Sequence, residues 1–199
     1  MKLMNKRIGF AMTGSYCTFA RVLKQVQALV EAGAQVQPIL SAVSHDLDTR
    51  FMSATELVLQ LECITGKQPW YTLQQVEPIG PKQLLDLMII APCTGNSLAK
   101  LAVGIADTPA LLAAKSTLRN GGPVLLAVST NDGLAGAGKN IGALFARKHI
   151  FFVPFGQDDP KGKPSSLVAR MESILEAAEE ALEHRQIQPV LLGAEKGVH

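Results

Sequence analysis

The sequence predicts a single α/β domain in which a doubly wound parallel sheet lies between two layers of helices. Short apolar runs alternate with stretches of helical periodicity along the chain, which is the pattern of such a sheet. The length of 199 residues suits one domain, and a hydrophobic content of 47% suffices for its core. No internal repeat or long linker divides the chain. One domain over residues 1–199 is therefore expected, with its core at 6–155.

The strands are predicted from short apolar runs that turn residues bound. They are expected at 6–13, 34–40, 87–91, 124–128 and 150–155. The run at 87–91 is unbroken, as in a central strand that is buried on both faces. Pro38 lacks the N–H group that a strand donates to its neighbour, so the second strand is expected near an edge of the sheet.

The helices are predicted where apolar residues recur every three or four positions. They are expected at 16–32, 53–64, 97–104, 109–120, 139–149 and 165–185. Gly33 ends the first helix, Ser53 opens a capping box, and Thr108 caps the fourth helix. The remaining segments are expected to be a loop or short helix at 44–50, irregular structure at 67–81, and a mobile tail at 186–199.

The composition excludes several classes of protein. A net charge of +2, without basic stretches between aromatic residues, argues against nucleic acid as a partner. No apolar run approaches the roughly 18 residues of a membrane span, and the N-terminal run is too short for a signal peptide. Three dispersed cysteines indicate no disulfide framework, and no residues have metal-ligand spacing. A cytoplasmic protein with no metal and no membrane association is expected.

Small polar residues follow four of the predicted strands, where each strand passes into a helix. The carboxyl ends of parallel strands meet at one edge of the sheet, and ligands bind there in such folds. Helix N-termini carry partial positive charge, and hydroxyls add donors without bulk. The loops expected to bind a shared anionic ligand are Thr13–Ser15, Ser41, Cys93–Ser97 and Ser129–Asp132. The alternative is that they are ordinary N-caps, each serving only its own helix.

Two common phosphate-binding motifs are absent from these loops. The segment TGSYC at 13–17 does not complete a GxGxxG fingerprint, and no acidic residue ends the second strand, which argues against a dinucleotide. No GK[ST] sequence occurs, so there is no Walker loop. The hydroxyl-rich loops instead suit a phosphate joined to a polyol chain.

Two segments resemble a known protein family. TGSYCT after the first strand and APCTGNSLAKLAVGIAD at 91–107 are similar to the flavoprotein family of FMN-dependent cysteine decarboxylases and flavin prenyltransferases. The second motif is long and specific, and the similarity covers residues 6–155. The resemblance implies a flavodoxin-like, Rossmann-like fold and an FMN site. The site residues that it implies are Gly14, Ser15, Ser41, Thr94, Gly95, Asn96, Ser97 and Ser129. The resemblance also implies a homo-oligomer, a trimer or dodecamer, with flavin near an interface between protomers.

A narrower resemblance within this family rests on SHDLDTRF, LAVSTNDGLAG, FVPFGQDDPKGKPSS and the chain length. The similarity is to one of the two different chains of an oxidoreductase whose substrate is a small dicarboxylate. It implies that NAD(P), if used, is bound by the other chain, which accounts for the missing fingerprint in this one. Whether this chain has catalytic activity alone stays open.

The chain departs from the family pattern where the decarboxylases act on their substrate. Pro78 and Ile79 stand where those enzymes have a catalytic histidine, and STND at 129–132 replaces their Pro-Ala-Met-Asn clamp. Three hypotheses remain: one chain of a larger enzyme, a stand-alone decarboxylase or flavin prenyltransferase, and a non-catalytic module of the same fold. The candidates for a catalytic residue are His45, Cys93 and Lys139. Each also has a structural explanation: His45 as an exposed loop residue, Cys93 as a small buried side chain, and Lys139 as a solvated surface charge.

Overall fold

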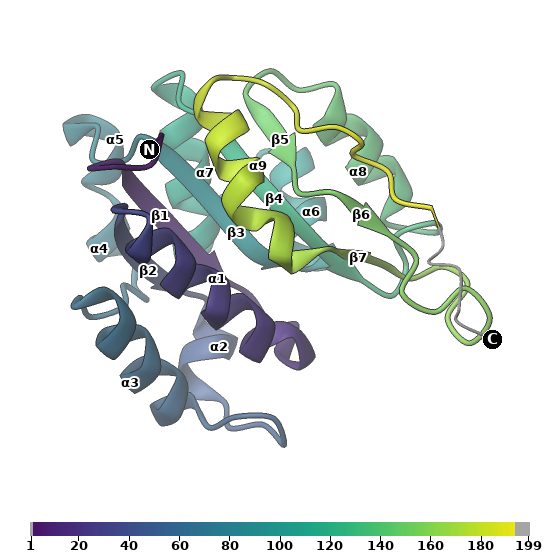
Figure 1. The fold of residues 1–199 in the computed structure, drawn as a ribbon, viewed down its shortest axis with the longest axis horizontal. Coiled ribbons are helices and arrows are strands. Elements are labelled where there is room, and N and C mark those ends of the chain that lie inside the picture. Colours follow the sequence, from purple (N-terminus) through teal and green to yellow (C-terminus); the bar gives the residue numbers. More distant parts are fainter. Residues whose placement is uncertain (1, 194–199) are drawn as a thin grey trace.

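A computed structural model describes residues 2–193 as three layers, with a mostly parallel sheet between two layers of helices (Figure 1). This confirms the predicted fold class. The strands are β1 (Arg7–Met12), β2 (Gln35–Leu40), β3 (Leu87–Cys93), β4 (Val124–Thr130), β5 (Ile150–Phe152), β6 (Phe155–Gly156) and β7 (Leu167–Ala169). The helices are α1 (Phe19–Glu31), α2 (Ala42–Asp46), α3 (Ala54–Thr65), α4 (Leu73–Val76), α5 (Ile79–Lys82), α6 (Gly95–Ala102), α7 (Pro109–Arg119), α8 (Gly138–Phe145) and α9 (Ile174–Leu182), with 3-10 turns η1 (Tyr16–Thr18) and η2 (Met171–Ser173).

The order of the strands decides which loops meet. Strands β2, β1, β3 and β4 are neighbours in that order, and all their pairings are parallel. Strand β5 pairs in parallel with the first half of β4, whereas β7 pairs antiparallel with its last two residues. Strand β6 pairs antiparallel with β7. Because β1, β3 and β4 are direct neighbours, their carboxyl ends lie side by side.

The core follows the apolar pattern of the strands. All seven residues of β3 are buried, as its unbroken apolar run predicts. Strand β2 ends the order of paired strands, which confirms the edge position that Pro38 indicates. On its outer side, Ile39 forms only an isolated bridge with Trp70. The missing N–H group of Pro38 therefore costs the sheet no ladder hydrogen bond.

Helices cover both faces of the sheet, with α1 and α9 in front and α6 and α7 behind in the view of Figure 1. The positions that α1 buries recur at helical spacing and are Phe19, Val22, Leu23, Val26 and Leu29. Gly33 follows this helix at a φ of +89°, and a Cβ there would lie 2.6 Å from the Met4 sulfur. Both the backbone angle and the close approach require glycine at this helix end.

The predicted helix at 165–185 is wrong in its first half. Residues Leu167–Ala169 form β7 because they pair with both β4 and β6, and these ladder hydrogen bonds override the helical periodicity of the segment. Helix α9 begins only at Ile174. The predicted strand at 150–155 is also divided, since the chain passes through Pro154, which has no N–H group to donate.

Other expected boundaries change for local reasons. Helix α6 begins at Gly95, two residues before the expected start, because Thr94 is its N-cap. The segment 67–81, expected to be irregular, contains α4 and the start of α5. Helix α4 is opened by a capping box between Thr72 and Gln75. Helix α8 ends at Phe145 rather than at 149.

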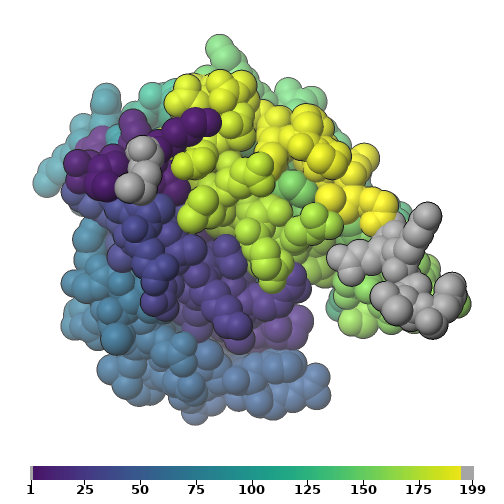
Figure 2. All heavy atoms as spheres, viewed as in Figure 1, coloured from purple at the N-terminus to yellow at the C-terminus, as the bar shows by residue number. Residues whose placement is uncertain are grey.

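The expected mobile tail holds fixed contacts in its first part. The Gln186 side chain donates to the Phe152 carbonyl at 2.7 Å and accepts from its N–H at 2.8 Å. Leu191 forms a bridge with Phe155, and this segment lies over the surface beside α9 (Figure 2). Residues 194–199 lie outside the described range. Across residues 2–193, every helix is too short or too polar to cross a bilayer.

Candidate functional site

The site predicted from the sequence lies at the carboxyl edge of the sheet, and its eight residues are called the rim. Strands β1 and β4 are joined there across β3, because Ser15 Oγ and Ser129 Oγ share a hydrogen bond of 2.7 Å. Strands β1 and β3 are joined by Thr13, whose hydroxyl donates to the Pro92 carbonyl at 2.7 Å and accepts from the Thr94 N–H at 3.3 Å. The ends of three strands therefore form one continuous surface.

The N-terminus of α6 supplies the next part of the rim. Thr94 Oγ1 accepts from the Ser97 N–H at 3.4 Å, and the two hydroxyls lie 3.1 Å apart. The first N–H groups of the helix, at Gly95 and Asn96, have no partner within a helix. The Asn96 side chain is exposed and makes no hydrogen bond to another described residue. These groups are available to a ligand, whereas Thr94 and Ser97 also serve the helix itself.

Two glycines of the rim have different surroundings. A Cβ at Gly95 would lie 2.7 Å from Thr130 Oγ1 and 3.1 Å from Asp132 Oδ1, so the start of α6 approaches the end of β4 too closely for a side chain. A Cβ at Gly14 would meet only the Tyr16 ring, at 3.8 Å. The folded chain itself therefore requires glycine at 95, but it leaves open space at 14.

Ser41 lies one strand further out, after β2. Its hydroxyl accepts from the Ser44 N–H at 3.3 Å and lies 2.9 Å from Ser44 Oγ, so it caps α2. Its own N–H donates to the Met12 carbonyl at 3.2 Å, which connects it to the end of β1. Ser41 is buried, and its N-cap role is established by these contacts.

The three candidates for catalysis have different environments. Cys93 is fully buried in β3, and burial raises the pKa of its thiol, so it is protonated at neutral pH. His45 lies on α2 behind Ser41, where its ring stacks on Tyr71 with 3.7 Å between centroids and Nδ1 bonds to Asp46. Lys139 is exposed near the start of α8. A thiolate is thus disfavoured at Cys93, whereas His45 is held in one orientation.

Several contacts at this edge could not be predicted from the sequence. Thr13 is buried and bridges two strands, and Ser44 is buried beside Ser41. Thr130 donates to the Asp132 carboxylate, which fixes the turn after β4 against Gly95. The sequence places each of these hydroxyls after a strand, but their partners lie up to 81 residues away.

The donor set fits the phosphate and ribityl chain of FMN. It offers the N-terminus of α6, an exposed amide at Asn96, and the hydroxyls of Ser15 and Ser129 next to the open space at Gly14. Three cavities of about 420–520 Å³ open on the surface, and none of the three is lined by a rim residue. Gly14 and Asn96 are exposed, so this part of the rim faces outward in a single chain. Within residues 2–193, no cluster of three His, Cys, Asp or Glu side chains is placed to hold a metal ion.

The chain is similar in sequence and fold to several known proteins. Residues 1–157 match the family model Flavoprotein. The chain is 47% identical over 190 residues to the B subunit of dipicolinate synthase from Bacillus subtilis (strain 168), covering 96% of this chain and 95% of that protein. The crystal structure of the corresponding B subunit from Bacillus halodurans superposes with a TM-score of 0.90 at 47% identity, covering 97% of this chain and 99% of that one.

A more distant neighbour shows the same fold. The FMN-dependent cysteine decarboxylase SpaF has a TM-score of 0.65 at 17% identity, covering 92% of this chain and 99% of that chain. At this identity the likeness concerns the fold alone. The family model spans β1 to β6 and includes every residue of the rim. The chain therefore belongs to the Flavoprotein family.

Proposed function

We propose that this chain is the B subunit of a dipicolinate synthase, an oxidoreductase that it forms with the A subunit of that enzyme. The observation that carries the proposal is the 47% identity to a protein of that name, which extends over nearly the full length of both chains. The proposed place of action is the cytoplasm of the mother cell of a sporulating bacterium.

The proposed reaction converts a hydroxytetrahydrodipicolinate to dipicolinate. The substrate loses one molecule of water, and then two electrons and two protons pass to an acceptor, which makes the ring aromatic. Flavin or nicotinamide is the acceptor, and NAD(P), if used, is bound by the A subunit. The rim of this chain offers hydroxyls, an amide and helix N–H groups, which suit binding and orientation more than proton transfer.

FMN is the cofactor proposed for the rim. When bound, its isoalloxazine ring accepts or donates electrons in pairs or singly. Asn96 and the first N–H groups of α6 would bind its phosphate or ribityl oxygens, and Gly14 would leave room for them. Ser15 and Ser129 share one hydrogen bond, so one of the two hydroxyls would still donate to the cofactor, and both would keep acceptor capacity.

A homo-oligomer, a trimer or dodecamer, is also proposed. The open rim needs a second surface to enclose a ligand. Val103 and Ile105 after α6 are 69% and 46% exposed, and they provide apolar surface for a neighbouring copy. Most of the small residues at 110–114 are instead buried within their own chain, so they do not provide it.

The proposal is tested with the purified chain, first by itself and then mixed with the A subunit. We expect flavin absorbance and an FMN mass in stoichiometric amount, and dipicolinate formation only when both proteins are present. Asn96→Ala should lose flavin while keeping its thermal stability, because this side chain is exposed and unbonded. Gln74→Ala, another exposed amide without a side-chain bond to a described residue, is the matched control.

Three results would change the assignment. Release of carbon dioxide from a peptide-like cysteine by this chain alone would establish a decarboxylase instead. Synthesis of dipicolinate by the two proteins without any bound flavin would exclude FMN as the cofactor. It would favour the hypothesis of a non-catalytic partner module with the same fold. Full flavin retention in Asn96→Ala would show that the cofactor, if present, lies away from α6.

A further inference from the structure

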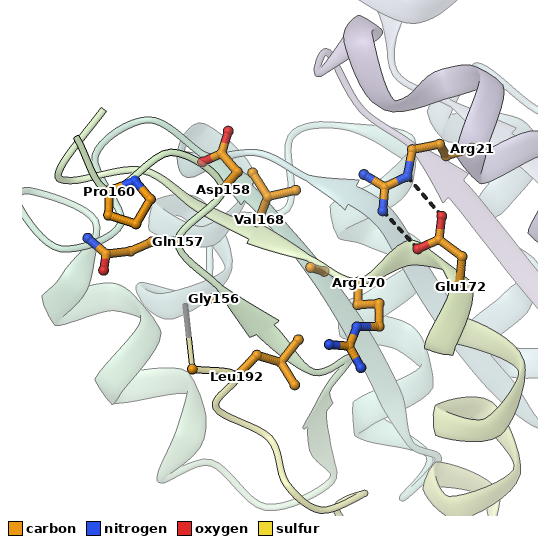
Figure 3. Close-up of a pocket in the computed structure, with 11 residues that line it drawn as sticks. Arg21, Gly156, Gln157, Asp158, Pro160, Val168, Arg170, Glu172 and Leu192 are labelled. Carbon is orange, nitrogen blue, oxygen red and sulfur yellow. Dashed lines mark hydrogen bonds and ion pairs between the residues drawn. The ribbon is translucent and has the colours of Figure 1, made fainter. Parts of the chain in front are cut away.

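A cavity of about 520 Å³ opens between β7, the segment after β6, and the start of α1. Its lining includes an apolar part at Val168, Ala169 and Leu192 and a charged part at Arg21, Arg170 and Glu172. Figure 3 shows Val168, Leu192 and Arg170 around it, with the Arg21–Glu172 pair at one side. The volume suits a small organic molecule.

The cavity is next to the rim. In the antiparallel pairing of β4 and β7, Val168 lies directly opposite Ser129, so the two side chains point to the same face of the sheet. Ser129 in turn shares its hydrogen bond with Ser15. Arg170 follows two residues later, also in extended backbone, and its side chain points toward Leu192, on the other side of the cavity from Val168 (Figure 3). A ligand that contacts Val168 would therefore lie near the Ser15–Ser129 end of the rim.

One charged side chain of the lining, Arg170, makes no side-chain hydrogen bond to another described residue. Arg21 donates to both oxygens of Glu172, at 2.9 and 2.8 Å, and holds the pKa of that carboxyl down to about 2. Asp158 faces the Lys163 ammonium at 3.8 Å. The Arg170 guanidinium makes no hydrogen bond or ion pair with a side chain in residues 2–193, although its charge acts on Glu172 from a distance. The cavity thus presents free guanidinium donors next to apolar surface.

We propose that Arg170 binds one carboxylate of a small, flat dicarboxylate whose ring lies against Val168 and Leu192. A guanidinium forms two parallel hydrogen bonds with a carboxylate, and the apolar side chains match the faces of a ring. The Arg21–Glu172 pair closes one side of the cavity, where its compensated charge attracts no further anion. This inference rests on the proposed function for the identity of the dicarboxylate, and it names the residue that recognises it.

The test is calorimetric titration of the full chain with pyridine-2,6-dicarboxylate, with pyridine as the probe that lacks carboxylates. We expect Arg170→Gln to raise the Kd for the dicarboxylate about tenfold, because a charge-assisted pair is lost. Arg170→Lys keeps the charge without the paired geometry, so its loss should be smaller. Pyridine should bind too weakly to detect in all variants. Arg119→Gln removes an exposed arginine from a different cavity and should leave the Kd unchanged.

The outcomes separate this inference from the proposed function. A Kd within twofold of wild type in folded Arg170→Gln, or an equal loss in Arg119→Gln, would overturn the inference. Thermal unfolding checks the fold, and Arg170→Lys decides the result if the glutamine variant is unstable. Failure to form dipicolinate with the A subunit would refute the proposed function, yet Arg170-dependent binding would stand. Normal synthesis with an unchanged KM in Arg170→Gln would refute the inference alone.

Discussion

The two glycines of the rim give a matched pair of perturbations, Gly95→Ala and Gly14→Ala. Each adds one methyl group at the same edge of the sheet, but the space available differs. The Cβ at 95 would lie 2.7 Å from Thr130 Oγ1, which is itself held by Asp132. The Cβ at 14 would lie 3.8 Å from the nearest side-chain atom, and Gly14 is not among the glycines with positive φ.

The magnitudes follow from these distances. Overpacking at 95 costs about 1–3 kcal/mol, and Gly95 is the first residue of α6, where the helix propensity of an interior position does not apply. This loss corresponds to a fall in Tm of about 2–12 °C for a chain of this size. Gly14→Ala should change the unfolding free energy by less than about 0.5 kcal/mol. It should nevertheless reduce flavin retention, because its methyl group occupies the space proposed for FMN.

Differential scanning calorimetry measures the two Tm values, and visible absorbance of the purified proteins measures bound flavin. A Tm of Gly95→Ala within about 1 °C of wild type would refute the steric argument at the start of α6. A comparable fall in Gly14→Ala would show that the space at 14 is not open. Wild-type flavin content in Gly14→Ala would place the cofactor elsewhere.

Three further predictions concern stability and reactivity. The buried Cys93 should resist alkylation in the native state, whereas the exposed Cys17 and Cys63 should react. Mass spectrometry of the protein alkylated in the native and in the unfolded state measures this, and labelling of all three cysteines in the native protein would contradict it. Ser166 has a buried hydroxyl without a partner in the described chain, so Ser166→Ala should unfold at an equal or higher denaturant midpoint, and a clear loss would reveal a missed bond. The pKa of His149 in the folded state is lowered by burial and by the charges of His184 and Lys148. Below pH ~6.5 the unfolded state therefore binds more protons than the folded state, so the free energy of unfolding should fall as the pH falls through this range. Asparagine tolerates the φ of +67° at this position, so His149→Asn should fold and its stability should depend less on pH. Identical pH profiles of stability for wild type and variant would argue against a role of His149.

Local signals were sufficient for many elements. Gly33 has the positive φ that its place after a helix predicts, and Thr108 caps α7 by accepting from the Leu111 N–H at 3.3 Å. These features depend on residues within one helical turn of each other, so the sequence contains the whole interaction. The unbroken apolar run of β3 likewise determines its burial on both faces.

The failures share a physical cause. Residues 167–169 have a helical pattern of apolar positions, yet they form β7 because strands β4 and β6 present free edges to them. No local signal reports an edge that is made by segments far away in the chain. Arg170 follows directly on this strand, so its place in the lining of the cavity was also not predictable.

Apolar periodicity, helix caps and the motif at 91–107 are local properties, so they predict the fold class, the family and the polar loops at the ends of the strands. Which of those loops meet depends on the tertiary structure. Ser15 and Ser129 are 114 residues apart and share a hydrogen bond because β1 and β4 flank β3. The tertiary structure also decided that Cys93 is buried and that Arg170 lines a cavity. Pairing order and burial arise from contacts between distant segments, and no window of the sequence contains them.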